Sequence, residues 1–81
     1  MDPEATLRRL CRQHRVPFAS ARRLTPLLRR AAGASLEVRR NLLAVVEAAL
    51  ACEAEAIARR ERLERQALLG VASVLHRWPE G

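Results

Sequence analysis

Two cysteines and two histidines are the residues of this chain that could ligate a metal ion or act in catalysis. Cys11 and His14 are three positions apart and share one helix face, and Cys52 with His76 would complete a two-Cys, two-His set of the kind that zinc accepts. Structural zinc sites normally use two close ligand pairs, however, whereas Cys52 and His76 are 24 positions apart. The spacing therefore predicts reduced, buried core cysteines and histidines near helix ends, with no metal site.

Other catalytic constellations are equally sparse. Acyl transfer of the triad kind needs a Ser or Cys nucleophile, a His base and an orienting acid. Among the few hydroxyl groups, Thr25 and Ser35 are better explained as helix N-caps. The three glycines are isolated from one another, so no phosphate-binding loop is present. We therefore expect neither an enzyme, nor a cofactor site, nor a small-molecule substrate.

The arginines are the one strong chemical signal, because all 15 basic residues are Arg. Residues 1–40 carry ten Arg against three acidic residues (net +7), whereas residues 41–81 carry five Arg against six Glu (net −1). Guanidinium groups bind carboxylate or phosphate with paired hydrogen bonds, so we expect an acidic protein or a nucleic acid as partner. Codon bias is the alternative explanation for Arg without Lys. The predicted contact residues are Arg8, Arg9, Arg12, Arg22, Arg23, Arg29, Arg30, Arg39 and Arg40.

The spacing of these arginines raises a nucleic-acid alternative. Arg22 and Arg29, like Arg23 and Arg30, are seven positions apart, which places each pair on one side of a continuous helix. A helix–turn–helix over residues 3–32 would then present its second segment to a nucleic acid. No Lys, Asn or Gln accompanies these arginines to read base edges, so such binding would use the phosphate backbone. The structural alternative is that the pairs are the solvated faces of small helices.

A long amphipathic helix capped by Ser35 is the element that must position these groups. One apolar row advances in alternating steps of four and three residues, and a second row lies beside it. Two adjacent rows make a stripe that needs neighbours on both flanks. Beyond Ala58 the stripe narrows to a seam through Leu63 and Ala67, as in a helix that leaves a small bundle to meet a partner chain. The first row is Val38, Leu42, Val45, Ala49, Cys52 and Ala56, and the second is Leu36, Leu43, Val46, Leu50, Ala54 and Ile57.

Shorter helices precede the long one. Asp2 is a good N-cap, and Val16 stands before a proline, which ends the first helix. Thr25 is the expected N-cap of a later helix that begins with a proline, and Gly33 is the expected left-handed stop at its end. Gly70 marks a bend or a close contact in the long helix. The predicted helices span about 3–15, 18–24, 26–32, 36–69 and 71–78.

The sequence leaves two structures open for residues 18–32 and two for the chain at Gly70. Residues 18–32 can form one kinked helix in place of two. At Gly70 the long helix either continues or folds back, and a fold-back would cover the wide stripe and give a monomeric bundle. We favour the dimer.

Length and composition complete the prediction. The 81 residues allow one domain, and its richness in Ala and Leu favours helix over strand. The predicted fold is all-α, with short N-terminal helices packed on one long amphipathic helix in a small bundle completed by dimerisation. Neither a signal peptide nor a membrane-spanning segment is visible, so a cytoplasmic location is expected. We expect a non-enzymatic, oligomerising helical interaction module with an Arg-rich N-terminal face. The predicted self-association residues are Leu42, Val46, Leu50, Ile57, Leu63, Leu68 and Leu75.

Overall fold

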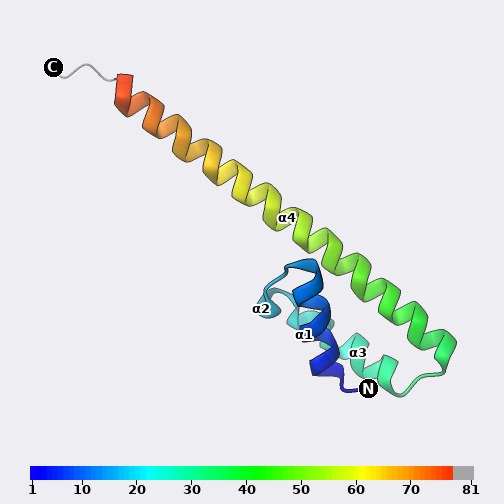
Figure 1. The fold of residues 1–81 in the computed structure, drawn as a ribbon. Coiled ribbons are helices and arrows are strands. Elements are labelled where there is room, and N and C mark those ends of the chain that lie inside the picture. The colour runs from blue at the N-terminus through cyan, green and yellow to red at the C-terminus, as the bar shows by residue number, and fades with distance from the viewer. Residues whose placement is uncertain (78–81) are drawn as a thin grey trace.

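The chain folds as a small helical lobe beside one long helix (Figure 1). The computed structural model describes the backbone of residues 1–77 and the side chains of residues 1–71. This part of the chain contains helices and no strand, which confirms the all-α prediction. The elements are α1 (Pro3–His14), α2 (Phe18–Ala21), the 3-10 helix η1 (Arg22–Leu24), α3 (Thr25–Ala32) and α4 (Leu36–Arg77).

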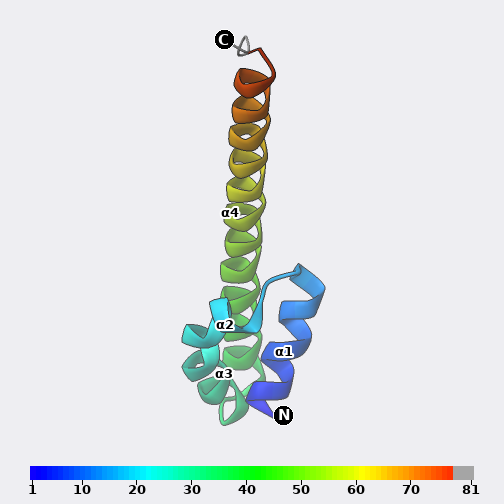
Figure 2. The ribbon, with the colours of Figure 1, turned by 90° about the vertical axis from the view of Figure 1, so that its left-hand side faces the viewer.

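The first four elements, residues 3–32, form what we call the N-terminal lobe. Figure 2 shows α1 and α3 side by side on the N-terminal half of α4, while the C-terminal half of α4 projects beyond them. The Cα positions extend over 71 × 17 × 17 Å, so the molecule is a rod that is thicker at one end.

Both ends of α1 are fixed by local hydrogen bonds. The Asp2 carboxylate accepts from the backbone N–H groups of Glu4 (3.1 Å) and Ala5 (3.4 Å), which confirms the predicted N-cap. At the other end Arg15 adopts a left-handed conformation (φ 58°), and the N–H of Val16 donates to the Cys11 carbonyl at 2.9 Å. This Schellman geometry turns the chain and buries Val16 in the core.

The second segment has nearly the extent of the two predicted helices, 18–24 and 26–32, but without a break between them. The short helix α2 tightens into η1, and η1 passes directly into α3. Leu24, not Thr25, occupies the N-cap position of α3, and no side chain caps this end. An N-cap residue needs an extended backbone, whereas Thr25 has helical backbone angles because η1 runs straight into α3.

The C-terminus of α3 is capped by an arginine from the next helix. The Arg39 side chain donates from Nε to the Ala31 carbonyl (3.0 Å) and from Nη2 to the Ala32 carbonyl (3.3 Å). The prediction of a left-handed stop at Gly33 is wrong, because this residue has φ −98°. The guanidinium satisfies the last carbonyls of α3 in place of a left-handed turn.

Replacing Arg39 with alanine is expected to lower the free energy of unfolding by about 1–2 kcal/mol, because two charge-assisted hydrogen bonds to half-buried carbonyls are lost. Urea denaturation followed by circular dichroism measures the change. Arg40→Ala is the matched control, since Arg40 is exposed and its loss should change stability by less than about 0.5 kcal/mol. Equal effects of the two substitutions would contradict the capping role.

Helix α4 begins after Ser35, whose Oγ accepts from the Val38 N–H at 3.4 Å. The helix continues without a break through Gly70, where the sequence left a bend or a fold-back open. No heavy atom beyond the local backbone lies within 4 Å of a Cβ built at Gly70, so this glycine marks no close contact. The fold-back that would cover the wide stripe does not occur. Trp78, the last residue of the predicted 71–78 helix, lies outside the described residues.

The core lies between the lobe and one row of α4. Leu7 of α1, Leu28 of α3, and Val46 and Leu50 of α4 are fully buried. We call the α4 side of this contact the inner row, because it faces the lobe. The inner row is Leu43, Val46, Leu50, Ala54 and Ile57, and the neighbouring Ala49 also packs against the core.

Candidate interaction surfaces

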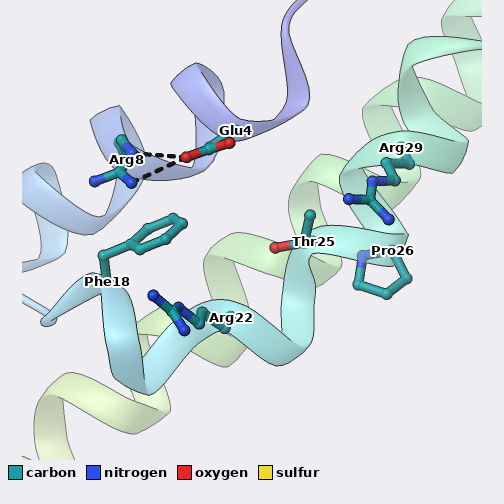
Figure 3. Close-up of a pocket in the computed structure, with 7 residues that line it drawn as sticks. All are labelled: Glu4, Arg8, Phe18, Arg22, Thr25, Pro26 and Arg29. Carbon is teal, nitrogen blue, oxygen red and sulfur yellow. Dashed lines mark hydrogen bonds and ion pairs between the residues drawn. The ribbon is translucent and has the colours of Figure 1, made fainter.

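Three arginines from three helices line one groove of the lobe, which we call the arginine groove. Arg8 comes from α1, Arg22 from η1 and Arg29 from α3 (Figure 3). The groove has a volume of about 430 Å³. Its complete lining is Glu4, Arg8, Phe18, Arg22, Thr25, Pro26 and Arg29.

Phe18, the one phenylalanine of the chain, holds two of these guanidinium groups. The guanidinium carbon of Arg8 lies 4.0 Å from the centre of the Phe18 ring, and that of Arg22 lies 5.9 Å from it. Both distances are within the range of cation–π attraction. Arg8 also donates to Glu4 Oε1 from Nη2 (2.9 Å) and Nε (3.3 Å). Figure 3 shows the ring between the two guanidinium groups, with Arg29 on the other side of Thr25.

The other predicted contact arginines are divided between structural and exposed positions. The prediction that Arg39 contacts a partner is wrong, because its guanidinium caps the C-terminus of α3. Arg23 lies 3.7 Å from Glu53 of α4, and Arg60 approaches the same carboxylate at 3.8 Å, so Arg23 connects the lobe to α4. The remaining four are exposed at the surface: Arg9, Arg12, Arg30 and Arg40.

The two apolar rows of α4 have different environments. The inner row packs against the lobe. The first row of the sequence analysis, which we call the outer row, is exposed at Val38, Val45 and Cys52 and half-buried at its other three positions. Val38 is 46% exposed and Val45 is 54% exposed, and Cys52 is exposed between half-buried neighbours. The outer row is Val38, Leu42, Val45, Ala49, Cys52 and Ala56.

The predicted self-association residues must therefore be corrected. Val46 and Leu50 are fully buried inside the chain, and Ile57 packs against the same core. The short helices already cover this row, so Val46 and Leu50 have no free surface for a second chain, and Ile57 is half-buried. Leu42 is half-buried in the outer row.

The C-terminal half of α4 carries the remaining members of that set. Leu63 is 59% exposed and Leu68 is 70% exposed, and every residue from 59 to 71 is exposed. The side chain of Leu75 lies outside the described residues. An isolated helix is marginal in water, and most helical stability in proteins comes from packing of an apolar face. This half of α4 therefore has apolar side chains available to a partner.

The two cysteines differ in their exposure to solvent. Cys11 is buried in the lobe, and this burial raises the pKa of its thiol, while nearby Arg8 acts in the opposite direction. Cys52 is exposed, so the prediction of two buried thiols is wrong for this residue. Its position in the outer row explains the difference, since the lobe packs mainly on the inner row and leaves Cys52 exposed.

Among the described residues, the candidate metal and catalytic side chains are not brought together, and the side chain of His76 lies outside that part of the chain. His14 Nε2 lies 3.9 Å from Glu47 Oε1, at the contact between α1 and α4. Within the described residues, no group of three or more His, Cys, Asp or Glu side chains is placed to hold a metal ion. In the same part of the chain, no helix combines the length and the apolar character needed to cross a membrane.

Sequence reasoning found Arg22 and Arg29 as members of one surface through their seven-residue spacing, and it missed Phe18 and Glu4. A ring flanked by arginines from another helix has no local signature, since Arg8 and Phe18 meet only through the turn at Arg15. Comparison of the chain with family models, with curated proteins and with solved structures gives no match.

Proposed function

We propose that this chain is a non-enzymatic α-helical interaction module that forms a homodimer through the outer row of α4 and presents its Arg-rich lobe to an acidic partner. The observation that carries this proposal is the outer row itself. Its six apolar positions alternate in steps of four and three, which is the repeat that packs one helix against another along a seam. Val38, Val45 and Cys52 of this row are exposed, while Leu42, Ala49 and Ala56 are half-buried.

A second copy of the chain fits the outer row for two reasons. Its small residues Cys52 and Ala56 permit close approach of a second helix, while Val45 and Leu42 supply apolar area. Charges of both signs also alternate along the exposed helix that follows, so two copies can match opposite charges across their contact. The residues concerned are Arg59, Arg60, Glu61, Arg62, Glu64 and Arg65.

The acidic-partner half of the proposal is supported by the lobe. Residues 1–40 have a net charge of +7, and eight of their ten arginines are exposed or line the arginine groove without capping α3 or pairing with Glu53. Reduced thiols at Cys11 and Cys52 agree with a cytoplasmic location, which we include in the proposal.

Sedimentation equilibrium over a concentration series tests self-association. The expected result is a concentration-dependent rise to twice the chain mass of 9.1 kDa. A constant mass of 9.1 kDa up to millimolar concentration would overturn the dimer and leave the outer row to a different protein.

Nucleic-acid binding through the arginines is the second candidate, favoured by the same net charge of +7 in residues 1–40. Binding of duplex DNA and single-stranded RNA across a salt series tests it. If several phosphates are neutralised, the logarithm of affinity falls linearly with the logarithm of salt, by about 0.9 per phosphate for duplex DNA. No binding at low salt would exclude this candidate.

A further inference from the structure

We propose that the arginine groove binds a dianionic phosphate monoester, carried on a phosphorylated serine or threonine of a protein partner. This inference rests on the acidic-partner half of the proposed function and is independent of self-association. It names the chemical group that the lobe would recognise.

The guanidinium groups come from three separate helices and line one open groove. Figure 3 shows Arg8 and Arg22 at one end, Arg29 at the other and Thr25 between them. Arginine offers a planar fork of donors that matches the oxygens of phosphate. The Thr25 hydroxyl adds a donor between the arginines. Such a set can donate to several oxygens of one phosphate group.

Two of the three arginines are already held in place. Arg8 stacks on Phe18 at 4.0 Å and is bonded to Glu4, and Arg22 lies 5.9 Å from the same ring. A side chain that is ordered before binding loses less conformational entropy when the ligand arrives. This arrangement favours anion binding over an equal number of loose surface arginines.

The charge of the lining matches a monoester better than other biological anions. Three arginines and Glu4 give the groove a net charge of 3 − 1 = +2. A phosphorylated serine carries about −1.5 to −2 near neutral pH. A carboxylate or a phosphodiester carries only one negative charge.

The size and the aromatic ring favour a peptide over a nucleic acid. A volume of about 430 Å³ accommodates one phosphorylated side chain and its neighbours rather than a length of duplex. Stacking of bases on aromatic side chains is a main source of single-strand affinity, but the Phe18 ring is already flanked by Arg8 and Arg22. Phe18 and Pro26 instead offer apolar contact to residues beside the phosphate.

Titration of the full chain with a short alanine-based peptide containing one phosphoserine tests the inference. Amide chemical shifts of the lobe should change, and the affinity should exceed that of matched peptides with glutamate or unmodified serine at the same position by about tenfold or more. Lowering the pH from about 7.5 to about 5.5 should weaken phosphopeptide binding several-fold, because the second phosphate pKa is about 6. The guanidinium groups of the lining keep their charge over this range.

Arg29→Ala and Arg30→Ala form the matched pair of variants, since the two residues are neighbours in α3 and only Arg29 lines the groove. Arg29→Ala should weaken the phosphopeptide about tenfold, and Arg30→Ala less than about twofold. Arg29→Lys keeps the charge but loses the fork, so it should recover only part of the affinity. Both positions are exposed, and helical circular dichroism verifies that each variant folds.

Each contrary outcome separates this inference from the proposed function. Equal affinity for the glutamate and phosphoserine peptides would overturn the phosphate inference and leave the acidic partner in place. Equal losses from Arg29→Ala and Arg30→Ala, with tight DNA binding, would overturn the groove and favour a nucleic acid spread over the basic face. Failure of every anionic probe would overturn both, while sedimentation would still decide self-association.

Discussion

Replacing Leu50 with alanine is expected to lower the free energy of unfolding by about 2–5 kcal/mol. Leu50 is fully buried in the inner row, where the lobe packs on α4. Truncation removes apolar contacts and leaves a cavity that the surrounding helices fill only in part. Because small domains are stable by only about 5–15 kcal/mol, this loss should shift the urea midpoint strongly and weaken docking of the lobe.

Leu68→Ala is the matched control, since Leu68 lies on the same helix and is 70% exposed. Its effect on unfolding of the monomer should be less than about 0.5 kcal/mol. If Leu50→Ala were as mild as this control, the lobe would not be packed against the inner row in solution. Both variants should be measured at protein concentrations low enough to dissociate a dimer, so that the comparison reports only on the fold.

Replacing Val45 with glutamate is expected to raise the dissociation constant of the homodimer by about a hundredfold or more. Val45 is 54% exposed in the single chain, so the monomer should fold normally. In the dimer each copy would bury a carboxylate within an apolar seam, and an unpaired buried charge is strongly unfavourable. Sedimentation equilibrium and denaturation of the variant measure the two effects separately.

Ala51→Glu is the control for added charge, because Ala51 is exposed on α4 but belongs to neither apolar row. It should leave the dissociation constant within a few-fold of the original value. If Val45→Glu dimerised as well as Ala51→Glu, the outer row would not be the contact between copies.

The elements that depend on local chemistry were predictable from the sequence. The N-caps at Asp2 and Ser35 and the helical class follow from residues within one turn of each position. The division of α4 into two adjacent rows also follows from the spacing of its apolar residues.

Which of the two rows the lobe covers was not predictable. Both rows have comparable apolar content, and the choice depends on how α1 and α3 pack together, which involves residues far apart in the chain. The self-association set therefore included Val46 and Leu50, which belong to the core. The exposure of Cys52 has the same origin.

For the arginines too, the local spacing was predictable from the sequence and the tertiary contacts were not. A seven-residue spacing predicts that Arg22 and Arg29 share a side, and both line the arginine groove. The capping role of Arg39 depends on the turn that brings the end of α3 against the start of α4. The number of arginines in the sequence does not show which of them caps a helix, so Arg39 was predicted to contact a partner like the neighbouring arginines.

The most direct test of the dimer through the outer row is the alkylation rate of Cys52 as a function of protein concentration. Cys11 is an internal reference, because it is buried and its raised thiol pKa reduces the reactive thiolate. We predict that Cys52 reacts rapidly in dilute solution and progressively more slowly as the dimer forms, while Cys11 reacts slowly throughout. A rate for Cys52 that stays the same at every concentration would contradict burial of the outer row by a second copy.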